Sequence, residues 1–162
     1  MKSAWLHLRR ARYFIGPYSE TPDITVIGPP PYYVVEEPCE REQLGRAVRR
    51  AIDASRAEKF ALPDLKQVSD ERGLELARLA GVQDRRTFER GNRYVSVDCI
   101  GDDKILITPH FRKRGYWEPV PETQWLTLER PTDAQLGSDH RGGASGRVTF
   151  DRHSLHAGPD YD

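Results

Sequence analysis

The sequence predicts an α+β fold, in which two to four helices pack mainly on one face of a twisted antiparallel β-sheet. The first observation is a β-hairpin pattern in residues 94–108, and the second is an amphipathic helix pattern in residues 40–55. The third is the order of the predicted elements, which runs from three strands through two helices to a β-meander. This separation of strands from helices along the chain is typical of α+β folds.

The hairpin has the strongest local signal. Residues 94–100 and 104–108 are rich in β-branched and aromatic side chains, and the glycine and two aspartates at 101–103 are turn formers. Alternation places two sets of side chains on opposite faces of the first strand: Val95, Val97 and Cys99 on one, and Tyr94, Ser96 and Asp98 on the other. We expect one face of this hairpin to be buried and the other to be at least partly exposed to solvent.

Three strands are predicted before the first helix. Residues 4–15 mix apolar and basic side chains and predict one strand, interrupted near Arg10 and ended by Gly16. Residues 24–27 and 32–36 predict two further short strands. The three successive prolines between them cannot join a β-ladder and therefore form a stiff connection.

The helices are predicted from apolar spacing and from capping residues. One apolar stripe at helical period runs along residues 40–55, through Leu44, Ala47, Val48, Ala51 and Ile52. A second helix is predicted over residues 69–79, with Ser69 as its N-cap and Gly81 after its end. Residues 84–90 predict one further helical turn, with Phe88 pointing inward.

The C-terminal third is predicted to contain a basic loop, a strand over residues 124–129, and the start of a helix at residues 132–140. A faint internal repeat occurs here. In both copies a strand is followed by a proline and then by a helix that opens with Gln-Leu-Gly, at residues 43–45 and again at 135–137. We predict one domain over residues 1–140 and a flexible tail over residues 141–162, where core-forming side chains are sparse.

Composition excludes several classes of function. The 162 residues carry 25 basic and 25 acidic side chains, so net charge gives no overall attraction to nucleic acid or to an anionic membrane. No apolar run has the ~20 residues of a membrane helix, and the N-terminus has no apolar signal segment. Cys39 and Cys99 form neither a metal motif nor a disulfide framework, which indicates a reducing cytoplasm.

The sequence contains no Gly-rich phosphate-binding loop after a strand and no G-x-S-x-G motif, and residue chemistry alone does not name a function. His153 and His156 have H-x-x-H spacing but lie in the predicted tail, and a metal site requires further convergent ligands. The basic and aromatic residues at 110–117, with Arg112, Lys113 and Arg114 at their centre, support one alternative function, a small nucleic-acid-binding module. The competing interpretation is a solvated loop whose Tyr116 and Trp117 pack on the sheet.

Five segments of the chain resemble a family of immunity proteins from contact-dependent growth inhibition (CDI) systems of Gram-negative bacteria. They are LARLAGV at 76–82, RTF at 86–88, GNRYVSV at 91–97, WEPVP at 117–121 and the acidic-QLG opening at 133–137. The resemblance covers roughly residues 36–140. It implies a cytoplasmic protein that binds the C-terminal toxin domain of a cognate effector, in many cases a nuclease acting on transfer RNA. It also implies that the chain is not an enzyme and carries no cofactor. Nucleic acid and membrane are not expected partners.

An inhibitor of a nuclease is expected to present acidic side chains to a basic cleft and to add aromatic anchors. The acidic candidates form two groups, Asp98, Asp102 and Asp103 on the hairpin and Glu36, Glu37 and Glu40 after the third strand. The candidate anchors are Tyr116 and Trp117, with Trp125 as a further possibility. If Asp102 and Asp103 are central, reversing their charges is expected to weaken toxin binding by well over tenfold.

Overall fold

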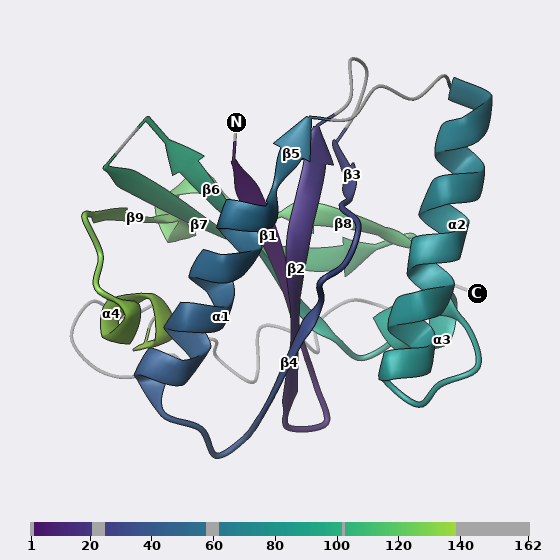
Figure 1. Ribbon diagram of the computed structural model, residues 1–162, viewed down its shortest axis with the longest axis horizontal. Helices are drawn as coiled ribbons and strands as arrows, with labels where there is room; N and C mark the ends of the chain where they lie inside the picture. Colours follow the sequence, from purple (N-terminus) through teal and green to yellow (C-terminus); the bar gives the residue numbers. More distant parts are fainter. Residues whose placement is uncertain (1, 21–24, 58–61, 102, 139–162) are drawn as a thin grey trace.

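The computed structural model of the protein describes residues 2–20, 25–57, 62–101 and 103–138 (Figure 1). Within these ranges the chain forms nine strands in one sheet, four α-helices and one 3-10 turn. The predicted α+β class, the antiparallel sheet and the number of helices are confirmed. The predicted tail, with His153 and His156, lies outside the described residues.

The N-terminal part forms a hairpin, two short strands and a helix. These elements are β1 (Ser3–Arg9), β2 (Arg12–Glu20), β3 (Thr25–Ile27), β4 (Tyr33–Glu36) and α1 (Arg41–Ala54). The prediction of one strand over residues 4–15 is corrected. Arg10 and Ala11 adopt positive φ values of 47° and 59°, which make a two-residue turn whose twist matches paired strands.

The central part contains β5 (Arg56–Ala57), α2 (Leu62–Leu79) and α3 (Arg85–Glu89). Helix α2 begins earlier than predicted, so Ser69 is not its N-cap. A proline at position 63 is compatible with this start because the first helical turn needs no backbone donor. The short helix α3 is confirmed, and the Asp84 carboxylate caps it by accepting a hydrogen bond from the Thr87 N–H at 2.7 Å.

The C-terminal part repeats the pattern of the N-terminal part. It contains β6 (Arg93–Ile100), β7 (Lys104–Lys113), β8 (Tyr116–Pro119), the 3-10 turn (Glu122–Gln124), β9 (Leu126–Glu129) and α4 (Asp133–Ser138). The predicted basic loop at 110–117 is instead the end of β7, a tight turn and the start of β8. Arg114 and Gly115 close that turn with positive φ values of 49° and 90°.

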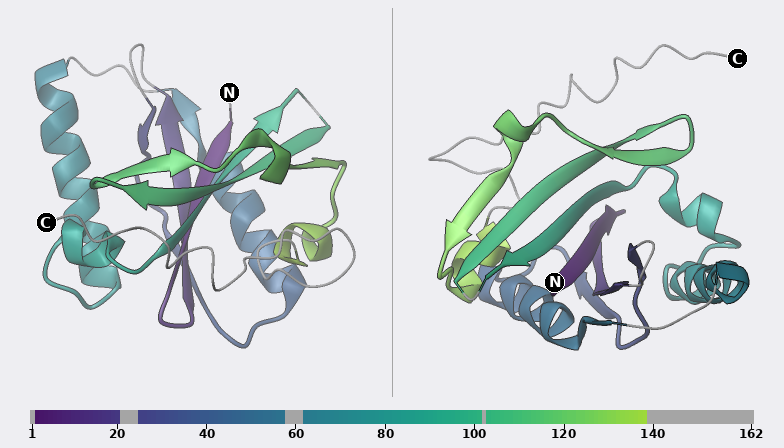
Figure 2. Two further views of the ribbon diagram at one scale, coloured as in Figure 1. Left: turned by 180° about the vertical axis from the view of Figure 1, so that it is seen from behind. Right: turned by 90° about the horizontal axis from the view of Figure 1, so that it is seen from above.

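The helices lie on both faces of the sheet, whereas the sequence predicted them mainly on one. The strand order is β3-β2-β1-β6-β7-β8, with β4 also paired to β2 and β9 also paired to β7. Alternate residues of β1 point to opposite faces of the sheet and pack into two separate cores. Leu6 packs with α1 and α4 on one face, which we call the first face. Trp5 packs with α2 and α3 on the opposite face, which we call the second face. Figure 2 (right) shows α1 and α4 together on one side and α2 and α3 on the other.

The two ends of the chain form equivalent halves, residues 3–54 and 93–138. In the first half Tyr13 of β2 pairs with Val35 of β4, and in the second half Ile105 of β7 pairs with Leu128 of β9. The halves meet through the antiparallel β1–β6 pair. The order of strands is therefore the same when read outward from this pair, which gives the sheet an approximate two-fold relation between its halves.

Hydrogen bonds outside the ladders repeat in the same way. Gly28 donates its backbone N–H to the Pro17 carbonyl at 2.8 Å, and Val120 donates to the Pro109 carbonyl at 3.0 Å. Both members of the second pair lie 92 positions after those of the first. A repeated bond of this kind shows that the two halves share backbone conformation as well as strand order.

The faint Gln-Leu-Gly repeat corresponds to the crossing of α1 and α4. A Cβ atom on Gly45 of α1 would overlap the carbonyl oxygen of Asp133, and a Cβ on Gly137 of α4 would overlap the carbonyl oxygen of Arg41. Each helix thus presents a glycine to the first turn of the other. The two backbones can approach this closely only because both positions lack a side chain.

Candidate functional site

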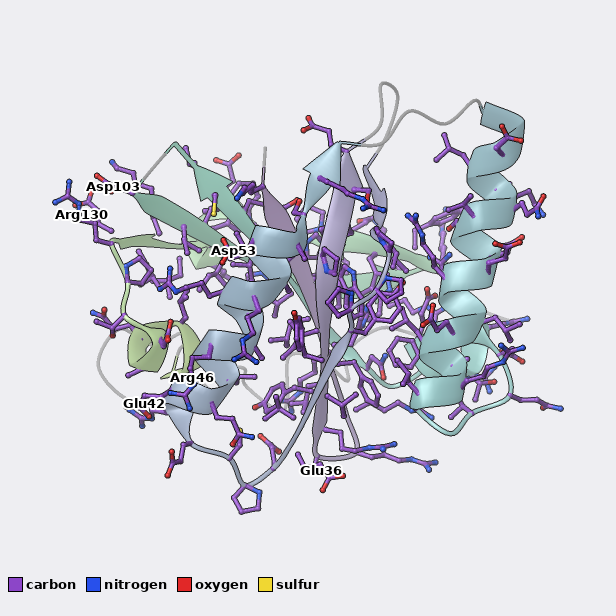
Figure 3. All side chains as sticks on the ribbon, in the orientation of Figure 1. Glu36, Glu42, Arg46, Asp53, Asp103 and Arg130 are labelled. Carbon is purple, nitrogen blue, oxygen red and sulfur yellow. The ribbon has the colours of Figure 1, made fainter. Side chains whose placement is uncertain are left out.

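The predicted binding residues lie at three separate places on the surface. Figure 3 shows Asp103 beside Arg130 at one edge of the molecule and Glu36 at another. Tyr116 lies at the β7–β8 turn, where it is the first residue of β8 and pairs with Lys113. The structure therefore does not bring the predicted acidic groups and aromatic anchors together into one continuous site.

The hairpin acids differ in environment. The Asp103 carboxylate accepts a hydrogen bond from the Arg130 guanidinium at 2.6 Å, so its charge is locally compensated at the surface. Asp98 points to the second face and is half-buried; burial raises its pKa, and a hydrogen bond from the Ser96 hydroxyl opposes that effect. Asp102 lies outside the described residues.

The second acidic group surrounds the connection between β4 and α1. Glu36, Glu37 and Glu40 are all exposed. The Glu37 carboxylate accepts a hydrogen bond from the Tyr13 hydroxyl at 2.7 Å, which fixes its position. Their involvement in binding stays a prediction, as does that of the hairpin acids.

The basic and aromatic residues of the β7–β8 turn give limited support to nucleic-acid binding. Arg112 pairs with Glu89 at 3.5 Å, and Lys113 pairs with Glu118 at 3.1 Å, so two of the three cations have acidic partners. Tyr116 is 77% exposed and is available as an anchor. Trp117 instead packs against the second-face core, with its ring centroid 5.2 Å from that of Tyr94.

Sequence reasoning missed a buried histidine at the centre of the second face. His7 is stacked on Tyr94, with ring centroids 4.7 Å apart, and also contacts Phe88 and Trp117. Burial lowers its pKa to about 3, with smaller contributions from Arg85 and His110. In the sequence His7 lies between Leu6 and Leu8, and strand alternation was the signal that placed its side chain on the same face as Trp5.

Ser96, Asp98 and His110 form a hydrogen-bonded chain that the sequence did not predict. The Ser96 hydroxyl donates to Asp98 at 3.3 Å and lies 3.1 Å from His110 Nε2. In a nucleophilic triad the carboxylate orients the imidazole, which then takes the hydroxyl proton. Here the serine lies between the two groups, and the buried Nδ1 atom of His110 has no hydrogen-bond partner among the described residues. Because the carboxylate does not contact the imidazole, this arrangement does not activate the Ser96 hydroxyl. Burial lowers the pKa of His110 to about 4.

A surface groove of about 560 Å³ lies on the first-face side, between the end of α1 and the β6–β7 turn. Its lining includes Lys2, Arg49, Asp53 and Cys99. Burial raises the pKa of the Cys99 thiol, which disfavours the nucleophilic thiolate. Arg49 is engaged with the start of α4, donating to Asp133 at 2.8 Å and to the Pro131 carbonyl at 2.7 Å. The groove therefore offers no arrangement typical of catalysis.

The described ranges contain neither a metal-binding cluster nor a helix able to span a membrane. No group of three or more His, Cys, Asp or Glu side chains in that part of the chain is placed to hold a metal ion. None of the helices found there has the length and apolar character needed to cross a membrane.

The fold is shared with solved structures of two bacterial proteins. A chain of the CdiA-CT/CdiI toxin and immunity complex from Yersinia pseudotuberculosis superposes with a TM-score of 0.71 at 17% identity, covering 87% of this chain and 95% of that one. A protein of unknown function from Neisseria meningitidis superposes with a TM-score of 0.67 at 17% identity, covering 84% and 88%. At these identities the likeness establishes the fold: an open, helix-covered antiparallel sheet.

The family follows from the sequence itself. The model of the CDI immunity protein family matches residues 30–144, which is most of the chain. The protein therefore belongs to the CDI immunity protein family, and the predicted resemblance is confirmed. No curated protein matches the sequence.

Proposed function

We propose that this protein binds and neutralises the C-terminal toxin domain of a cognate CDI effector. The observation that carries the proposal is the family match over residues 30–144. The Yersinia structure of similar fold comes from a complex of toxin and immunity protein, which supports the same kind of partner here. Inhibition acts through binding, without chemistry on a substrate and without a cofactor.

The toxin is proposed to be a nuclease, with transfer RNA as its substrate. Such an enzyme presents a basic cleft to RNA phosphates, and exposed carboxylates complement that charge. Glu36 at the end of β4 and Glu40 before α1 supply exposed negative charge, and Asp98 supplies a half-buried carboxylate on β6. We place the action in the cytoplasm, where the free thiols of Cys39 and Cys99 stay reduced.

The proposal predicts tight binding and protection in cells. Bacteria that express the chain are expected to survive exposure to the matching effector, and the purified chain is expected to bind the toxin domain with nanomolar affinity, equivalent to about −12 kcal/mol. Growth competition and isothermal titration calorimetry measure the two effects. Loss of viability equal to that of cells lacking the chain would refute the function.

The alternative is a nucleic-acid-binding module that uses the cations at 112–114. A gel-shift assay with transfer RNA at physiological salt separates the two functions. We expect no shift for the isolated chain, because Arg112 and Lys113 are already paired with glutamates. A shift at micromolar protein that disappears on replacing Arg114 would favour the alternative.

A further inference from the structure

One part of the second face has no helix over it within the described residues. This bare sheet face is formed by the ends of β6, β7 and β9 and contains Asp98, Ile100, Lys104, Leu106, Thr127 and Glu129. Asp98, Leu106 and Thr127 lie side by side on the three strands. In Figure 2 (left) α2 and α3 lie at one end of this face and the β6–β7 turn lies at the other.

The equivalent surface in the first half of the chain is covered. By the two-fold relation, Asp98 corresponds to His7, and Leu106 corresponds to Phe14. His7 pairs with Phe14 across β1 and β2, just as Asp98 pairs with Leu106 across β6 and β7. Phe14 and His7 are buried against α2 and α3, through side chains that include Leu76 and Phe88. The same backbone surface thus receives a helical layer in one half and has none in the other.

The side chains of the bare sheet face suit a partner with both positive and apolar groups. Asp98 is half-buried, accepts a hydrogen bond from Ser96, and has no ion pair within the described part of the chain. Ile100 is 47% exposed, and Leu106 beside Asp98 is half-buried. Lys104, the cation on the face, is already paired with Glu129 at 3.2 Å. A carboxylate that is partly desolvated and lacks a cation gains most from a partner that supplies one.

We propose that the bare sheet face is the docking surface for the toxin domain, which places a cationic side chain against Asp98 and an apolar side chain on Leu106. The inference rests on the proposed function and narrows it to one surface. It assigns the binding role of the hairpin acids to Asp98 rather than to Asp103, whose charge Arg130 compensates. The acidic group at Glu36, Glu37 and Glu40 lies in the other half and is not part of this surface.

The test compares two variants at equivalent positions. Thr127→Arg places a large cation on the bare sheet face beside Leu106, and Val34→Arg places one at the corresponding position of β4. Both wild-type side chains are exposed, which makes the pair a matched control. Titration calorimetry with a catalytically inactive toxin domain is expected to show at least a tenfold loss of affinity for Thr127→Arg and less than a threefold change for Val34→Arg.

A third variant tests the charge at Asp98. Asp98→Asn keeps the size of the side chain and is expected to weaken toxin binding at least tenfold, without lowering the thermal midpoint of the free protein. Equal affinity of Thr127→Arg and wild type would overturn the docking surface while leaving the proposed function intact. Failure of the wild-type chain to bind the toxin would overturn the function instead. Sedimentation showing a dimer that Thr127→Arg dissociates would assign the face to a second copy and also overturn the inference.

Discussion

Replacing Gly45 with alanine is expected to lower the free energy of unfolding by about 3 kcal/mol, at the upper end of the cost of overpacking a close contact. The added Cβ would overlap the carbonyl oxygen of Asp133. A backbone carbonyl in a helix cannot rotate away as a side chain can, so α1 and α4 must separate. Leu44 and Leu136, both fully buried near the crossing, would then lose packing. Urea denaturation followed by circular dichroism measures the change.

The matched control is a helical glycine with a flexible neighbour. A Cβ on Gly73 of α2 would come within 2.5 Å of the Arg85 side chain, which can move. Gly73→Ala is therefore expected to change stability by no more than about 1 kcal/mol, the size of the helix-propensity difference. By the two-fold relation Gly137→Ala should behave as Gly45→Ala does. Equal small effects at all three glycines would contradict the close helix crossing.

Acid is expected to destabilise the protein through His7. Below pH 6.5 the unfolded chain protonates this histidine, whereas in the folded protein burial holds its pKa at about 3. Between these values the unfolded state binds more protons, so stability falls as the pH is lowered. Each pH unit inside the window costs about 1.4 kcal/mol for one such group. Lowering the pH from 6.5 to 4.5 is therefore expected to cost about 2–3 kcal/mol through His7 alone.

Two other groups modify this pH dependence. His110 acts in the same direction, because burial lowers its pKa to about 4. Asp98 acts in the opposite direction, because its raised pKa lets the folded state bind a proton that the unfolded state releases. A His7→Phe variant keeps an aromatic ring beside Tyr94 and is expected to lose most of the slope between pH 6.5 and 4.5. Denaturation curves at several pH values measure it, and an unchanged slope would show that His7 is not responsible.

Local patterns determined much of the fold. The apolar stripe at helical spacing predicted α1 almost to its ends, and alternation assigned Val95, Val97 and Tyr94 to the correct faces of β6. These predictions succeed because a helix or strand presents its side chains at a fixed period, so burial of one face can be read from neighbouring residues. The family was also predicted from the sequence, through a resemblance carried by short contiguous segments such as residues 91–97, and the family match confirms it.

Tertiary structure decided the features that involve residues far apart in the chain. The faint Gln-Leu-Gly repeat indicated two related helices. Only the fold shows that Gly45 of α1 contacts the backbone of α4 and that Gly137 of α4 contacts the backbone of α1. The division of helices between two faces, the burial of His7 and the bare sheet face also depend on how β1 and β6 pair. Spacing along a sequence fixes which face a side chain shares with its neighbours. What covers that face is set by the path of the whole chain, through contacts between distant residues such as Arg41 and Gly137, which are 96 positions apart.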